Sequence, residues 1–135
     1  MITIDTIYKD IGKAMKGICD MIYAKNRPKS VDKRPSSYIV VRLPSGIFNQ
    51  EIGYDGAYND YTTTAQIEVY VRNKVSRSNV NDFDLSTTSD KVAQILKRFP
   101  INTDNLTVIR PMVTMQADDG DGFDVTIIQG QLRTK

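Results

Sequence analysis

The segment Thr64–Lys74 constrains the fold of this chain more than any other part of the sequence. Apolar and polar side chains alternate along it, with Ala65, Ile67, Val69 and Val71 interleaved with Gln66, Glu68, Tyr70 and Arg72. Successive side chains of a β-strand point to opposite faces of a sheet, so strict alternation is typical of a half-buried strand. The pattern predicts a long strand with one face on a core and the other facing water or a partner.

Two segments carry helical periodicity and can cover the core face. The first has apolar residues spaced by three and four at Ile4, Ile7, Tyr8, Ile11, Ala14, Met15, Ile18 and Ile22. This spacing predicts an amphipathic helix of about five turns that is capped by Thr3 or Asp5 and ends before Pro28. In the second segment, Asp82 or Asp84 can cap a helix that continues to Phe99, and Pro100 stops it.

The remaining strands are predicted as two pairs. Tyr38–Leu43 and Ile47–Tyr54 flank the turn Pro44–Gly46, while Leu106–Gln116 and Phe123–Arg133 flank an acidic turn at 117–122. Pro111 cannot donate a ladder hydrogen bond, so it marks a bulge or an edge.

Short connections join neighbouring strands in antiparallel order, and this fixes the predicted architecture. We expect one α+β domain over residues 1–135, with the element order α-β-β-β-α-β-β. Its antiparallel sheet would carry both helices on one face. The other face would present Glu68, Tyr70, Arg72 and Thr126 and would be free to meet a partner.

Composition argues against most enzyme classes. The chain has 135 residues, 40% of them hydrophobic and 25% charged, as in one ordinary soluble domain. It has no histidine and a single cysteine, which excludes Ser-His-Asp, Cys-His and histidine-metal chemistry as well as an internal disulfide. No glycine-rich phosphate loop is present. We therefore expect no enzyme, no catalytic or metal-binding residue and no cofactor, and we interpret Cys19 as a small buried hydrophobe.

The sequence also predicts no targeting segment. Charged residues interrupt the apolar positions near the N-terminus, which argues against a signal-peptide core. Apolar runs are too short to span a membrane, so we expect no membrane contact. The cysteine content fits a reducing compartment.

The net charge of +2, from 18 basic and 16 acidic residues, conceals two opposed clusters. Five basic residues lie between Lys25 and Arg34, in a long polar segment that predicts an exposed loop. Four acidic residues lie between Asp118 and Asp124. The basic cluster can contact phosphates, with Tyr23 or Tyr38 stacking on a base, or it can order against an acidic protein.

The acidic segment Asp118–Gly122 has two readings. Clustered carboxylates suggest calcium, but the glycine is not at the sixth position of the required pattern and no glutamate follows at the twelfth. A solvated hairpin turn fits better. A third polar segment contains Tyr54, Tyr58 and Tyr61, and it is either a protein interface or a surface loop with partly covered rings.

The succession of elements resembles a known family. An opening amphipathic helix, the strand Thr64–Lys74, an acid-capped helix from Asp82 to Phe99 and a closing hairpin together resemble the tail terminator, or tail-completion, proteins of long-tailed bacteriophages and related neck proteins. The resemblance covers nearly the whole chain.

The resemblance implies a structural virion protein without enzymatic activity or cofactor. Such a subunit would form a homo-oligomeric ring, commonly a hexamer, that caps the tail tube and joins it to the head connector. Its partners would be itself, tail-tube and head-connector proteins, with passing contact to DNA in the ring lumen. It would be assembled in the host bacterial cytoplasm and carried in the virion. The alternative is a small nucleic-acid-binding or regulatory α+β module that uses the basic loop 25–34.

A ring gives the opposed charges a role. Head-to-tail contacts join different surfaces of neighbouring subunits, and opposite charges can fix their register. We predict that Lys29, Lys33 and Arg34 face Asp118, Asp119 and Asp121 of a neighbouring subunit. The candidate interface also includes the tyrosines and the arginine of the exposed surfaces, namely Tyr54, Tyr58, Tyr70 and Arg72.

Overall fold

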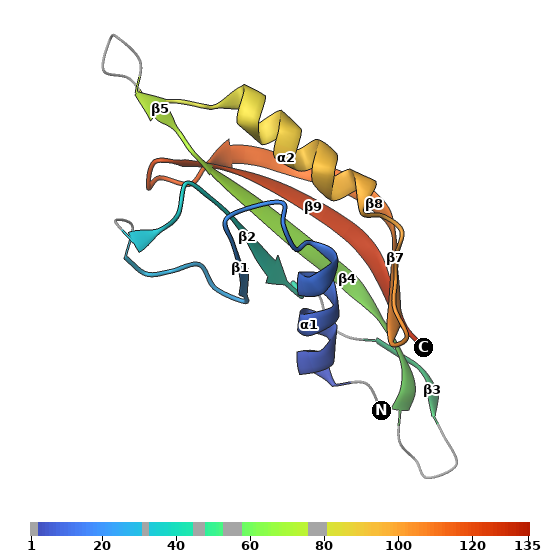
Figure 1. Cartoon of the computed structure of the whole chain (residues 1–135). Helices are drawn as coiled ribbons and strands as arrows, with labels where there is room; N and C mark the ends of the chain where they lie inside the picture. The colour runs from blue at the N-terminus through green and yellow to red at the C-terminus, as the bar shows by residue number, and fades with distance from the viewer. Residues whose placement is uncertain (1–2, 31–32, 45–47, 53–57, 76–80) are drawn as a thin grey trace.

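The computed structural model describes residues 3–30, 33–44, 48–52, 58–75 and 81–135, with the backbone alone at 48–52, 58–61, 75 and 81–82. It has an α+β fold, as predicted (Figure 1). The elements in chain order are α1 (Ile4–Ala14), β1 (Met21–Ala24), β2 (Ser37–Arg42), β3 (Phe48–Ile52), β4 (Tyr58–Arg72), β5 (Lys74–Val75), β6 (Asn81–Asp82), α2 (Leu85–Lys97), β7 (Ile101–Asn102), β8 (Leu106–Asp118) and β9 (Phe123–Thr134).

The main sheet is mixed, so the prediction of a purely antiparallel sheet is wrong. Its strand order is β1-β2-β4-β9-β8-β7, and β3 pairs with the beginning of β4. β1 runs parallel to β2, whereas the other pairs are antiparallel. β3 was expected to return along β2, but it pairs with β4, which begins at Tyr58 and so includes residues predicted as loop.

The first helix is shorter than its periodicity predicts. Thr3 caps it as expected, accepting a hydrogen bond from the Thr6 amide at 3.1 Å, but the helix ends at Ala14. Gly17 has a φ of +86°, a conformation that glycine adopts easily and that reverses the chain here. Ile18 remains buried and Ile22 packs on the same core from β1. Apolar residues whose spacing also fits a helix are therefore buried here by a turn and a strand.

Both helices pack on one face of the sheet, as predicted (Figure 1). Ile7 and Ile11 of α1 and Ile95 of α2 share one core with Ile67 and Val69 of the alternating strand. Asp84 caps α2 and accepts a hydrogen bond from the Thr87 amide at 3.1 Å. None of the described helices is long and apolar enough to cross a membrane.

The opposite face of the sheet carries a second, smaller core. This aromatic core consists of Tyr38 and Val40 of β2, Tyr70 of β4, and Phe123 and Val125 of β9. The expectation of a free face is therefore wrong around Tyr70, which is 6% exposed. Thr126 lies on the helix side, because it pairs with Val69 of the main core.

Candidate interaction surfaces

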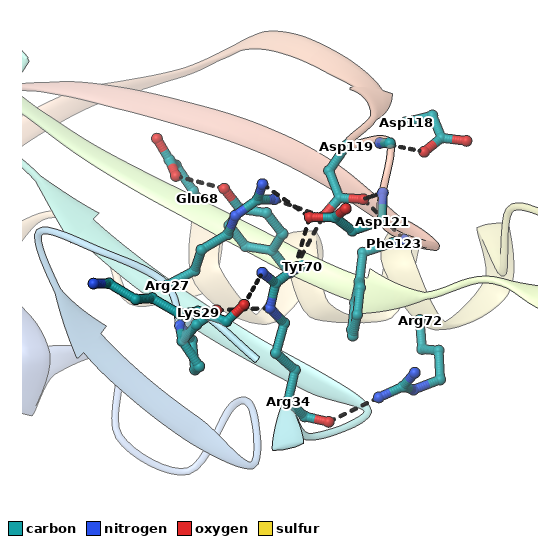
Figure 2. Close-up of polar contacts among 12 residues, drawn as sticks. Arg27, Lys29, Arg34, Glu68, Tyr70, Arg72, Asp118, Asp119, Asp121 and Phe123 are labelled. Atoms are coloured by element: carbon teal, nitrogen blue, oxygen red, sulfur yellow. Dashed lines mark hydrogen bonds and ion pairs between the residues drawn. The ribbon is translucent and has the colours of Figure 1, made fainter. Parts of the chain in front are cut away.

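The segment before β2 is largely exposed, as predicted for a loop, but its arginines also reach over the aromatic core. We call residues 25–30 and 33–36 the basic strap. Two of its arginines reach the β8–β9 turn and form a charge cluster of Arg27, Arg34, Asp119 and Asp121 (Figure 2). Arg27 Nη1 lies 2.7 Å from Asp119 Oδ2, and Arg34 Nη1 lies 3.1 Å from Asp121 Oδ2. The charge cluster therefore connects the strap to the turn between β8 and β9.

The turn holds its carboxylates in place with backbone hydrogen bonds. Asp119 Oδ1 accepts from the amides of Asp121 at 2.7 Å and Phe123 at 3.1 Å, which leaves Oδ2 for the arginines. Gly120 and Gly122 adopt positive φ, as a tight turn requires. The acidic segment is thus a hairpin turn whose Asp119 side chain is only 3% exposed.

Arg34 organises the strap from within. Its Nε donates to the Pro28 carbonyl at 2.8 Å and its Nη2 to the Lys29 carbonyl at 3.4 Å. The side chain is only 4% exposed. A buried guanidinium needs acceptors for its several N–H groups, and here two carbonyls and the Asp121 carboxylate supply them.

Aromatic rings fill the space beneath the strap. Tyr38 and Tyr70 stack with ring centroids 4.6 Å apart, and Phe123 meets Tyr38 edge to face at 5.4 Å. Guanidinium groups lie over two of these rings, Arg27 over Tyr70 at 5.8 Å and Arg72 over Phe123 at 4.6 Å. Stacking, cation–π contacts and ion pairs therefore hold the same segment.

A row of polar side chains continues from this core along β4. The Tyr70 hydroxyl donates to Glu68 Oε1 at 2.9 Å, and Gln66 Nε2 donates to Glu68 Oε2 at 2.6 Å. Arg42 Nε lies 2.9 Å from Glu68 Oε2. Burial, together with the Glu68 charge, raises the pKa of Tyr70 to about 12.

The structure corrects the predicted charge pairing. The basic and acidic segments meet, but Arg34 pairs with Asp119 and Asp121 of its own chain and not of a neighbour. Both partners belong to one chain because the strap crosses the sheet to the β8–β9 turn, a tertiary contact that no local pattern reveals. Tyr70 contributes to the aromatic core and not to the molecular surface.

The other predicted interface residues have varied positions. Lys29 and Lys33 are exposed, and neither forms an ion pair with a described residue. Asp118 is exposed and accepts a hydrogen bond from the Gly120 amide. Arg72 is exposed and donates to the Arg34 carbonyl at 2.7 Å. Tyr54 lies outside the described residues, as does the side chain of Tyr58.

Four of the nine exposed large hydrophobic side chains of the described residues lie on β8, whose outer edge is largely unpaired. β7 pairs only with Thr107 and Val108, and beyond them no described strand covers that edge. Register shifts lie between Ile109 and Met112 and between Val113 and Met115. The bulge or edge predicted at Pro111 is therefore confirmed, and both features are present.

The two bulges determine which way the β8 side chains point. Across β9, Ile109, Met112 and Met115 pair with Gln131, Gln129 and Ile127, on the face that carries the aromatic core. These three side chains are 41%, 63% and 48% exposed. Val113 points to the helix side, where it lies beside α2. We call Ile109, Met112, Val113 and Met115 the β8 edge surface.

A metal site and a reactive thiol each have requirements that can be compared with the described residues. No three side chains of His, Cys, Asp or Glu gather there as metal ligands. Cys19 is partly buried against the core, and this burial raises the pKa of its thiol, which lowers its reactivity at neutral pH.

The sequence analysis did not identify two residues that contribute to these surfaces, Phe123 of the aromatic core and Asp124 beside α2. Phe123 was read only as the start of a strand, and Asp124 as one more acid of the turn. The alternation rule offers a partial signal, since it places Tyr38, Val40 and Tyr70 on one face once the register is known. The chain matches no protein-family model and no curated protein sequence.

Proposed function

We propose that this protein is a structural subunit that assembles with copies of itself into a ring, of the kind that closes a bacteriophage tail tube at the neck. The observation that carries the proposal is the β8 edge surface, with four large apolar side chains exposed on an open strand edge. Exposed apolar patches on soluble domains mark contact sites, and unpaired edges are covered in native assemblies. The α+β fold and the order of its main elements support the family resemblance.

The charge distribution favours this function over nucleic-acid binding. Arg27 and Arg34, the two arginines of the basic strap, are held by Asp119 and Asp121. Guanidinium groups neutralised in this way offer little to a phosphate backbone. The strap keeps its exposed lysines, so the alternative is distinguished by binding at different salt concentrations.

Self-association of the β8 edge surface tests the proposal. We expect the wild-type protein to sediment as an oligomer, and Met112→Glu with Met115→Glu to shift it to the monomer, because two buried charges oppose association. The matched control is Lys9→Glu with Lys13→Glu, two substitutions on α1 that should leave the oligomer intact. Wild-type protein that stays monomeric at every concentration, and binds DNA with a steep salt dependence, would favour the alternative.

A further inference from the structure

A groove on the helix side of the sheet runs between α2 and β8. It has a volume of about 290 Å³, with Val92, Ala93 and Leu96 of α2 on one wall and Val113 of β8 on the other. Thr88, Gln116 and Thr126 also line it. The two walls are therefore apolar, and Thr88 and Gln116 form a polar part of the lining because both donate to Asp124.

Behind those polar groups lies the buried carboxyl group of Asp124. Asp124 is 0% exposed, and its Oδ2 accepts hydrogen bonds from Thr88 Oγ1 at 3.1 Å and Gln116 Nε2 at 3.0 Å. Among the described residues, its Oδ1 has no hydrogen-bond partner, and neither has the buried Oγ1 of Thr126. No described lysine or arginine forms an ion pair with Asp124. A buried polar atom without a hydrogen-bond partner is costly, so this site favours a hydrogen-bond donor.

The same chain carries two exposed lysines that form no ion pair with any residue the structure describes. Lys29 and Lys33 lie on the basic strap between Arg27 and Arg34, the two arginines of the charge cluster. The strap covers the aromatic core on one face of the sheet, whereas the groove opens on the helix face. The sheet separates the two, so a strap lysine can reach this groove only from another copy.

We propose that the α2–β8 groove receives a lysine of the basic strap, Lys29 or Lys33, from a second copy of the chain. The aliphatic stem of the lysine would lie along Val92, Leu96 and Val113, with its ammonium group among Thr88, Gln116 and Thr126, in front of the buried Asp124 carboxyl group. Lysine commonly buries its stem on apolar surface in this way. The contact joins two different surfaces, as a closed ring requires. This inference rests on the proposed self-assembly and names the residues that set its register.

A disulfide cross-link tests the contact without removing either lysine. In a Cys19→Ser background, protein with Ser30→Cys is mixed with protein with Val113→Cys and oxidised, and the covalent heterodimer is measured on a non-reducing gel. The matched control replaces Ser30→Cys by Lys9→Cys, an exposed position on α1. We expect the heterodimer yield of the Ser30–Val113 mixture to exceed the control several-fold.

Two sets of variants show whether the groove itself is responsible. Lys29→Gln with Lys33→Gln should lower the yield to the control level, and so should Ala93→Arg, which places a bulky cation at the exposed lip of the groove. Asp124→Asn should do the same, and Ala93→Arg keeps the test valid if Asp124→Asn fails to fold. Control-level yield in the parent mixture, or a high yield that survives Ala93→Arg, would overturn the inference. If rings form without this cross-link, the contact alone is wrong; if no oligomer forms, the proposed function is wrong as well.

Discussion

At the scale of single residues, the two arginines of the charge cluster differ sharply in burial. Arg34 is 4% exposed, whereas Arg27 is 31% exposed, although both pair with the same aspartates. Breaking a buried ion pair leaves an uncompensated charge, while an exposed pair contributes little. Burial, and not the number of contacts, should therefore decide the cost of losing each arginine.

We expect Arg34→Gln to lower the free energy of unfolding by about 3 kcal/mol and Arg27→Gln by about 1 kcal/mol. Lys33→Gln, on the same strap and with no ion pair to a described residue, should leave the free energy of unfolding nearly unchanged. Urea denaturation of the three variants measures these differences. Equal losses for Arg34 and Arg27 would show that the strap does not bury Arg34 in solution.

The raised pKa of Tyr70 predicts a loss of stability in alkali. Its folded pKa of about 12 lies above the ordinary value of 10, so the stabilisation is complete below pH 10 and is lost as the pH rises toward 12. The unfolded state releases the phenolic proton first, which favours unfolding over that interval. In Tyr70→Phe the free energy of unfolding should fall less steeply between pH 10 and pH 12. Parallel curves for the two proteins would contradict the buried Tyr70–Glu68 pair.

At the scale of elements, β9 must lie very close to its neighbours at Gly130. A Cβ added there would lie 2.7 Å from Val108 Cγ1 and 3.3 Å from the Ile109 carbonyl oxygen, at the start of the first β8 bulge. We expect Gly130→Ala to lower the free energy of unfolding by roughly 1–3 kcal/mol, as overpacking does.

Gly12 provides the matched control within α1. A Cβ at Gly12 would meet only Ile22 Cγ2 at 3.9 Å, an ordinary contact. Gly12→Ala should therefore raise the free energy of unfolding by about 0.5–1 kcal/mol, because alanine is the better helix former. Thermal unfolding of both variants gives the comparison, and a stabilising Gly130→Ala would mean that β8 and β9 are farther apart than described.

Local sequence patterns predicted those features of the elements that depend on neighbouring residues alone. Alternation placed β4, the Asp84 cap placed the start of α2, and Pro111 marked the irregular edge of β8. The end of α1 at Ala14 was missed, because apolar residues at three- and four-residue spacing served a strand after Gly17. The parallel pairing of β1 and β2 depends on the path of the chain after that reversal, which no single segment encodes.

The candidate surfaces were predicted only in part, because they also depend on contacts between segments that are distant in the sequence. Opposite charge correctly predicted that the basic and acidic segments attract each other, but it does not distinguish a contact within one chain from a contact between two. That distinction depends on the strap lying over Tyr38 and Tyr70, two aromatic residues on neighbouring strands. The unpaired state of Asp124 depends likewise on the packing of α2 against β9.

Across the molecule as a whole, two arginines and two aspartates pair within the fold, whereas large apolar side chains are exposed along one edge strand of the sheet. The charge cluster fastens the strap over the aromatic core, while the β8 edge surface remains exposed. The proposed assembly would cover this exposed surface. Assembly through this edge would add strand or side-chain contacts without refolding the domain.

Electron microscopy of the purified protein tests this account most directly. We expect closed rings of identical subunits, with sixfold symmetry in the averaged images, and dispersed small particles for the Met112→Glu, Met115→Glu variant. A wild-type protein that shows only single small particles at all concentrations, while its fold is intact by circular dichroism, would contradict self-assembly into a ring.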